Sequence, residues 1–246
     1  MRAWRVHELG DPSDVMSFDE VDVPTPGEGQ VLVKVKAAGI NPVDWKVMSG
    51  GLDPMMTVQF PATPGWDVAG VVVGKGFDTP SVSEGDEVIA YARKDWIHGG
   101  TFAQYVSVPV RALAPKPKSL SWEQAGGLPL AGLTAYQVLT RLGLAEGKTV
   151  LIHAASGGVG SMGVQIAKAF GARVIGTAST KNHDYVRELG AEPVEYGDGL
   201  VERVKELAPN GVDIVVDFVG GVVEDSVAVL ADGGQHASIA DPEVEE

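Results

Sequence analysis

Cysteine is absent from this chain of 246 residues, and its absence removes several kinds of chemistry. No disulfide can form, no thiolate can act as a nucleophile, and no zinc site can be built from cysteine. Histidine is scarce, and its few residues lie in unrelated stretches without the spacing of metal ligands: His7, His98, His153, His183 and His236. The sequence therefore predicts no metal site.

Long apolar runs and an excess of basic residues are also lacking. There is no run of about 18 apolar residues, and the N-terminal residues lack the apolar core of a signal peptide. The 19 basic and 33 acidic side chains give a formal net charge of −14, which disfavours nucleic acids and anionic membranes as partners. We expect an acidic, cytoplasmic α/β protein.

The first part of the chain, up to about residue 120, consists of short β-rich runs separated by proline and glycine. Val31, Val33 and Val35 alternate with Leu32, Lys34 and Lys36, as in a strand with one buried face. Short strands of this kind are typical of a β-barrel or sandwich. They are expected at residues 16–23, 30–38, 68–73, 87–91 and 103–108.

From about residue 121, helices and strands alternate. An interrupted helical stretch at 121–142 precedes an apolar strand at 149–153, and further helices and strands follow, among them a helix at 200–207. This alternation predicts a doubly wound parallel sheet of the Rossmann type. We therefore expect an α/β protein with two domains, residues 1–120 and 121–246. The acidic residues 241–246 are expected to be frayed.

The strongest local signal is the glycine-rich turn Ala154–Gly160, which follows an apolar strand and precedes a helix. In the dinucleotide fingerprint G-x-G-x-x-G, Ala155, Gly157 and Gly160 hold the glycine positions, so the first glycine is replaced. Gly157 would let a diphosphate approach the backbone, and Gly160 would permit close packing of helix on strand. A tight turn without a ligand is the alternative.

The loop after the second strand of this region bears on which dinucleotide binds. A carboxylate for the ribose of NAD is expected about 20 residues after the turn, but residues 176–183 contain no acid. Ser179 and Lys181 would suit a 2′-phosphate, so the sequence favours NADPH. The alternative for Lys181 is an ordinary solvated lysine.

Motifs along the whole chain resemble the medium-chain dehydrogenase/reductase superfamily, specifically its zinc-independent quinone oxidoreductase (zeta-crystallin-like) branch. The motifs are Gly39–Trp45, Pro64–Val72, Gly99–Val106, Leu128–Tyr136, Ala154–Gly160, Val215–Gly221 and Gly233–Ile239. The resemblance implies a GroES-like β-barrel substrate domain, a Rossmann domain that binds NADP, and a cleft between them. It implies an oxidoreductase that transfers a hydride from NADPH to a quinone or an α,β-unsaturated carbonyl.

The resemblance also implies site residues. Asn41, in an Asn-Pro-x-Asp turn, matches an asparagine beside the nicotinamide and is the candidate catalytic residue. The other candidate coenzyme-binding residues are Thr134, Ser156, Gly157, Gly158, Val159, Gly160, Ser179, Lys181, Tyr196, Val219, Ser238 and Ile239. Trp45, Met48 and Trp66 are candidates for an apolar wall against a flat substrate.

Several of these residues have a structural alternative. Asn41 also suits a turn before Pro42, and Thr134 can hydrogen-bond back to its own helix. Tyr196 can pack at a strand end, and the two tryptophans and Met48 can pack in a core or between domains. For Asp44 we favour a hydrogen bond in the turn over contact with substrate.

The zinc-dependent relatives carry a His-Glu pair after the Pro-Gly of the second motif, whereas Trp66 and Asp67 follow Pro64 and Gly65 here. Zinc stabilises the alkoxide that develops in alcohol oxidation. The loss of its ligands favours an electron-poor acceptor whose product anion is delocalised. The sequence names no general acid.

The family continues for several dozen residues beyond the last motif, and that segment includes the edge strand used for dimers. This chain stops at Glu246, so the sequence leaves both a homodimer and turnover open. The alternative function is a non-catalytic NADPH-binding sensor or crystallin-like protein.

Overall fold

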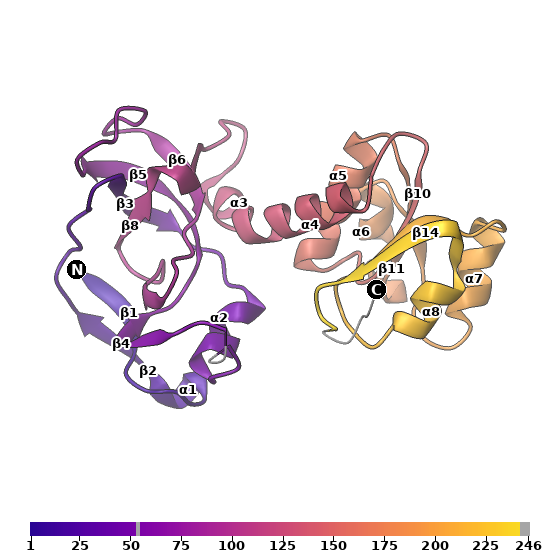
Figure 1. Cartoon of the computed structure of the whole chain (residues 1–246), viewed down its shortest axis with the longest axis horizontal. Coiled ribbons are helices and arrows are strands. Elements are labelled where there is room, and N and C mark those ends of the chain that lie inside the picture. The colour runs from indigo at the N-terminus through magenta and orange to yellow at the C-terminus, as the bar shows by residue number, and fades with distance from the viewer. Residues whose placement is uncertain (53–54, 242–246) are drawn as a thin grey trace. The chain divides into compact units, whose positions relative to one another are not determined.

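A computed structural model describes residues 1–52 and 55–241 of the chain (Figure 1). Residues 242–246, at the acidic end for which fraying is expected, lie outside the described residues. The chain divides into two compact units, Met1–Leu130 and Ala131–Glu246. Each unit is described by itself.

The first unit is built on two β-sheets. The antiparallel sheet has five strands in the order β8 (Tyr105–Pro109), β3 (Gln30–Ala37), β5 (Asp67–Lys75), β6 (Glu87–Tyr91) and β9 (Leu113–Pro115). The other sheet has the order β2 (Met16–Glu20), β1 (Arg2–Val6), β4 (Val58–Thr63) and β7 (Ile97–Gly99). The short helices of the first unit are α1 (Pro12–Val15), α2 (Pro42–Met48) and α3 (Trp122–Gly126), with a 3₁₀ turn at Val110–Ala112.

The alternation along β3 is confirmed, because Val31 and Val33 are fully buried while Lys34 is exposed. These valines form a core with apolar residues of β5, β6 and β8. The five expected strands correspond to β2, β3, β5, β6 and β8. The strands β1, β4, β7 and β9 are not among those expected from the sequence. β7 and β9 have three residues each, too few to show an alternation, and β4 contains Pro61. β1 is as long as β2, and its length does not explain why it was missed.

The second unit contains a parallel sheet with the strand order β12 (Glu192–Val194), β11 (Arg173–Thr177), β10 (Thr149–Ile152), β13 (Val212–Asp217) and β14 (Leu230–Ser238). Numbered along the chain, this is the order 3-2-1-4-5 of a doubly wound fold. The expected Rossmann sheet and α/β class are therefore confirmed.

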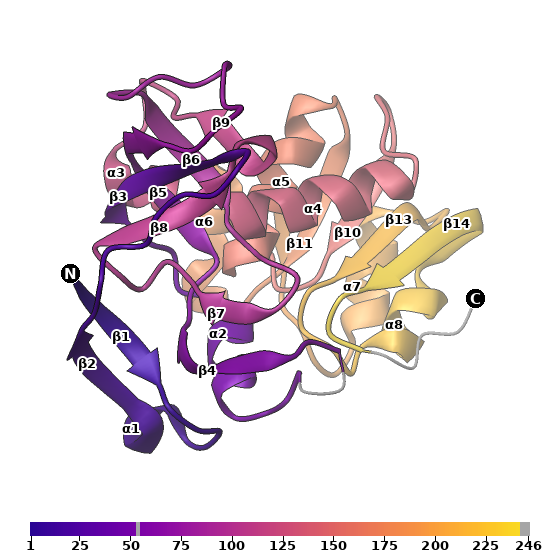
Figure 2. The ribbon, with the colours of Figure 1, turned by 60° about the vertical axis from the view of Figure 1, so that its left-hand side comes forward.

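Helices cover both faces of this sheet. Apolar residues of α4 (Pro129–Arg141), α5 (Gly158–Ala169) and α6 (His183–Glu188) pack with Val150 and Ile152 of β10. On the opposite face, α7 (Leu200–Leu207) packs with Leu151 and Val215. Helix α8 (Val223–Ala228) lies beside α7 (Figure 2). The 3₁₀ turn Thr180–Asn182 leads into α6.

The two units divide within α4, later than the expected domain boundary after residue 120. Helix α3 stands in the first unit because it packs on β3 and β5. Its close fit depends on two glycines, since a Cβ on Gly39 would lie 2.7 Å from the carbonyl oxygen of Gly126, and a Cβ on Gly126 would lie 2.9 Å from the Cβ of Ala37. Among the described residues, no helix combines the length and the apolarity needed to cross a bilayer.

Candidate coenzyme and substrate site

The glycine-rich turn joins the carboxyl end of β10 to the start of α5, with Gly157 as the N-cap residue. Ala154 adopts a left-handed backbone conformation with φ of 52°, and its N–H donates to the Thr177 hydroxyl at 3.0 Å. This bend turns the chain sharply before the helix begins. The first N–H groups of a helix have no partner within it and carry the positive end of its dipole, so they can bind a diphosphate.

The glycines of the turn have different environments. A Cβ on Gly160 would lie 2.1 Å from the carbonyl oxygen of Ala154, so only glycine allows the helix to approach the strand this closely. A Cβ on Gly158 would meet no atom within 4 Å, and Gly158 is exposed. Ser156 and Val159 are half-buried beside it. Gly158 therefore leaves an open backbone surface at the helix start.

The loop after β11 is tied to the glycine-rich turn. The Asn182 side chain donates to the Ser156 hydroxyl at 3.1 Å, and its main-chain N–H donates to the Ser179 carbonyl oxygen at 2.8 Å. Ser179 is half-buried and Lys181 is exposed. The structure thus brings Ser156 and the Ser179–Lys181 loop together. Sequence reasoning missed Asn182, although an amide beside Lys181 was a visible signal.

An acid also lies in this region. The Thr180 hydroxyl donates to Glu195 at 3.0 Å, just after the end of β12. The next residue, Tyr196, exposes 58% of its surface instead of packing at the strand end. Arg203 donates to the carbonyl oxygens of Glu195, Gly197 and Asp198 and so shapes the loop that carries Tyr196.

At the carboxyl ends of β13 and β14, the fully buried Asp217 organises the candidate nicotinamide residues. Its carboxylate accepts N–H groups from Val219 and Gly220 at 2.7 and 2.9 Å and the Ser238 hydroxyl at 2.8 Å. The Ile239 N–H donates to the main-chain carbonyl oxygen of Asp217. Burial alone would raise the pKa of Asp217, but these donors lower it overall. Asp217 thus brings together Val219, Ser238 and Ile239. The Ser238 hydroxyl donates its hydrogen to Asp217.

In the first unit, Asn41 lies between two buried carboxylates. Asn41 is the N-cap residue of α2, and its main-chain N–H donates to Asp44 at 2.7 Å. Its side-chain amide donates to Asp67 at 2.9 Å. The other oxygen of Asp67 accepts the Leu130 N–H near the start of α4, also at 2.9 Å. The role we favoured for Asp44, a hydrogen bond within the turn, is the one it has here.

Burial sets the acidity of both carboxyl groups. Asp44 exposes 2% of its surface and Asp67 none. Burial raises the pKa of each to about 6, against the lowering effect of the N–H donors, and the charge of Asp44 raises the pKa of Asp67 further. Sequence reasoning noticed Asp67 only as a replaced zinc-site residue and gave it no role.

The candidate substrate-wall residues differ in exposure. Trp45 is about half exposed, whereas Met48 and Trp66 are buried. Trp66 belongs to a core cluster with Val47 and packs edge-on against Tyr91, with ring centroids 5.9 Å apart. In the described chain, Met48 and Trp66 therefore contribute to packing within the first unit. Thr134 is half-buried on α4.

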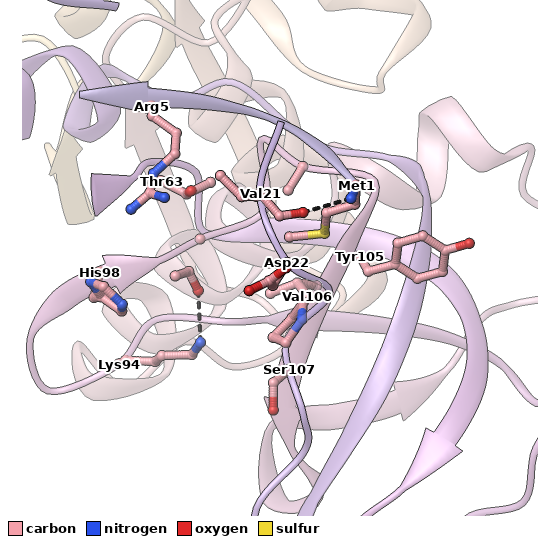
Figure 3. Close-up of a pocket in the computed structure, with 14 residues that line it drawn as sticks. Met1, Arg5, Val21, Asp22, Thr63, Lys94, His98, Tyr105, Val106 and Ser107 are labelled. Atoms are coloured by element: carbon pink, nitrogen blue, oxygen red, sulfur yellow. Dashed lines mark hydrogen bonds between the residues drawn. The ribbon is translucent and has the colours of Figure 1, made fainter. Parts of the chain in front are cut away.

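A cavity of about 350 Å³ opens elsewhere in the first unit (Figure 3). Arg5, Lys94, His98 and Asp22 contribute to its lining, and the Lys94 ammonium donates to the carbonyl oxygen of Gly99 at 2.7 Å. Burial lowers the pKa of Lys94. None of the site residues predicted from the sequence lines this cavity.

Within residues 1–52 and 55–241, no cluster of three or more His, Asp or Glu side chains has the arrangement of a metal site. Zinc independence remains a prediction from the residue types at positions 66 and 67.

Two family models match the chain. Residues 27–118 match the alcohol dehydrogenase GroES-like domain, and residues 158–246 match a domain described as zinc-binding dehydrogenase. Among solved structures, an alcohol dehydrogenase superfamily protein from Novosphingobium aromaticivorans is 34% identical with a TM-score of 0.91, covering 100% of this chain and 74% of that one. The quinone oxidoreductase from Coxiella burnetii is 34% identical with a TM-score of 0.82, covering 99% and 76%.

Curated relatives include the NADPH-dependent alkenal/one oxidoreductase of Arabidopsis thaliana and the 2-methylene-furan-3-one reductase of Solanum lycopersicum, each 38% identical. They match 96% and 95% of this chain, which spans 61% of the length of each. The human quinone oxidoreductase is 33% identical over 96% of this chain and 71% of its own length. The resemblance inferred from the motifs is thereby confirmed, and the chain belongs to the medium-chain dehydrogenase/reductase superfamily, in its quinone oxidoreductase-like branch.

Proposed function

We propose that this chain is an NADPH-dependent oxidoreductase that transfers a hydride to a quinone or an α,β-unsaturated carbonyl without zinc. The observation that carries the proposal is the turn at the start of α5, with its open surface at Gly158 and the close approach at Gly160. The names of the plant and human relatives, an alkenal/one oxidoreductase and a quinone oxidoreductase, support the acceptor class.

The residues of the second unit fit a phosphorylated dinucleotide. The first N–H groups of α5, from Gly158 to Gly160, would hold the diphosphate, with the Ser156 hydroxyl beside them. Ser179 and Lys181 would hold the 2′-phosphate, and Tyr196 would lie against the adenosine. Val219, Ser238 and Ile239, ordered by Asp217, would surround the nicotinamide with Thr134.

NADPH, when bound, supplies the hydride. The chain contributes orientation, because a positioned donor and acceptor react much faster than free ones. Asn41 would bind the carbonyl oxygen of the acceptor through its amide, and Trp45 would offer an apolar surface to a flat ring. Trp66 and Asp67 in place of a His-Glu pair support a reaction that does not depend on zinc.

Binding and turnover test the proposal separately. Titration of the protein with NADPH and with NADH, followed by coenzyme fluorescence, is expected to give tighter binding of NADPH. A panel of small quinones and enones should then oxidise bound NADPH, with no effect of added zinc or a chelator. Preference for NADH, or turnover only with added zinc, would refute it. NADPH binding without turnover on any acceptor would instead support the non-catalytic sensor or crystallin-like function.

Three finer points belong to the same proposal. Residues 1–120 would form the substrate domain and residues 121–246 the NADP-binding domain. The chain would act in the cytoplasm on a small molecule and form a homodimer. Cell fractionation and sedimentation of the purified protein test the last two points, since the names of several relatives place them in chloroplasts.

A further inference from the structure

The carboxylate of Asp67 accepts two N–H donors of different mobility. One oxygen accepts the main-chain N–H of Leu130, and the other accepts the side-chain N–H of Asn41, each at 2.9 Å. The main-chain donor is fixed by the start of α4, whereas the carboxamide of Asn41 can turn about its last bond. A change at Asp67 therefore acts first on Asn41.

Asp67 is the first residue of β5 and is fully buried. Water therefore cannot replace its two N–H donors. An ionised carboxylate can accept both N–H groups, and hydrogen bonds to a charged group are the stronger kind. The Asn41 amide has two hydrogens on its nitrogen, and Asp67 takes one. The second is left for a ligand.

We propose that Asp67 is the positioning residue for Asn41: its ionised carboxylate holds one amide hydrogen of Asn41 and thereby orients the second toward the carbonyl oxygen of the hydride acceptor. This inference rests on the proposed function for the identity of the acceptor. The arrangement of Asn41 by Asp67 stands on the geometry of the first unit alone.

A proton on Asp67 would disturb this arrangement. The Leu130 N–H keeps the accepting oxygen, so the proton sits on the oxygen that faces Asn41 and places a donor against a donor. Asn41 must then turn or lose the hydrogen bond. Burial raises the pKa of Asp67 to about 6, so this change falls within an accessible pH range.

Other charged groups surround this pair. Asp44 on α2 raises the pKa of Asp67. Tyr91 lies opposite Asp67 in the β5–β6 register. Burial and the charge of Asp67 raise the pKa of Tyr91, while Arg93 lowers it. The only acid of α3, which packs on β5, is Glu123, and it is exposed. Asp44 is therefore the group whose titration must be separated from that of Asp67.

The side-chain amides of asparagine allow a direct test without coenzyme. The chain has only three asparagines, Asn41, Asn182 and Asn210, so protein labelled with ¹⁵N-asparagine gives three side-chain NH₂ pairs, and N41S identifies that of Asn41. In the wild type, this pair is expected to shift between about pH 5 and pH 8 with a midpoint near the pKa of Asp67, while the exposed Asn210 serves as the internal control.

Two matched variants separate the acids. D67N should abolish the shift, because an amide at position 67 does not titrate. D44N should keep the shift and move its midpoint to lower pH, because a neighbouring negative charge is removed. A fixed Asn41 pair in the wild type, or a shift that survives in D67N, would overturn the inference. The wild-type titration alone decides if D67N does not fold.

Kinetics supply the second readout. With a quinone as acceptor, D67N is expected to lower kcat about tenfold, the equivalent of one lost hydrogen bond, and to leave NADPH affinity within about twofold. The wild-type rate should fall below about pH 6 toward that of D67N, which should lack this dependence. An equal loss of NADPH affinity would indicate a merely structural role and overturn the inference. If NADPH does not bind at all, the proposed function fails, while the NMR titration still tests the positioning of Asn41.

Discussion

Replacing Gly160 by alanine tests the close approach on which the coenzyme turn depends. The added Cβ would lie 2.1 Å from the carbonyl oxygen of Ala154 and 2.8 Å from its carbonyl carbon. Both atoms belong to the backbone, so no flexible side chain can move aside. The strand end or the first turn of α5 must shift by about 1 Å to restore an ordinary contact.

The expected cost follows from this overlap. Overpacking in a tight site costs about 1–3 kcal/mol, and the better helix propensity of alanine returns at most about 1 kcal/mol. We expect G160A to lower the free energy of unfolding by about 2 kcal/mol and the Tm by about 4–8 °C. It should also weaken NADPH binding, because the N–H groups of the turn move.

Gly158 provides the matched control. It lies in the same helical turn, but its added Cβ would meet no atom within 4 Å. G158A should therefore melt at or slightly above the wild-type temperature. It should nevertheless weaken NADPH binding about tenfold or more, because the methyl group would occupy the surface proposed for the diphosphate.

Circular dichroism measures the melting of the whole chain, and coenzyme fluorescence measures binding. All five tryptophans lie in the first unit, at positions 4, 45, 66, 96 and 122, so their fluorescence checks separately that this unit stays folded. A G160A protein that melts with the wild type, or a G158A protein that melts below G160A, would refute the reasoning.

Three further predictions concern charge. K181M should raise the KM for NADPH about five- to tenfold and leave that for NADH unchanged, as expected for one phosphate contact; the exposed Lys205 on α7 gives the control variant K205M. Burial lowers the pKa of His153, whose ring nitrogen is 3.1 Å from the Ser226 hydroxyl. The unfolded chain therefore gains this proton before the folded protein does as the pH falls through about 6.5, so stability to urea should fall there, and less so in H153F. The carboxyl groups of Asp44 and Asp67 act in the opposite direction. Their pKa values of about 6 exceed the ordinary 3.8, so the folded state binds protons first and gains stability as the pH falls from about 7 to about 5. In D44N, urea unfolding followed by tryptophan fluorescence should show a smaller gain of stability over this pH range. An unchanged gain would contradict the raised pKa assigned to Asp44.

The order and type of elements in the second unit could be predicted because each has a strong pattern. The bounds of α7, Leu200–Leu207, agree with the predicted helix at both ends. The strand before the glycine-rich turn and the helix after it also appear where the sequence places them. A parallel sheet buried on both faces favours continuous apolar strands, and these stand out from the helices between them.

The hydrogen bonds of the candidate site could not be predicted, because they join residues that are distant in sequence. Asp67 and Leu130 are 63 residues apart, and Asn182 and Ser156 are 26 apart. The burial of Trp66 and Met48 was equally open, since an apolar side chain is compatible with a core and with a substrate wall. Only the packing of Trp66 against Tyr91 and the other residues of its cluster distinguishes the two.

Asp67 illustrates how a motif can keep a position while its chemistry changes. An acid after Trp66 looks like the remnant of a His-Glu pair when the sequence is considered alone. In the fold, its two oxygens join the N-cap residue of α2 to the start of α4, a helix with no acid in its own first turn. A negative charge at this helix start is stabilising, while burial and Asp44 oppose it. The net result of these opposed effects is a pKa of about 6 for Asp67. Around that pH, a small change alters whether its carboxyl group can accept the side-chain N–H of Asn41.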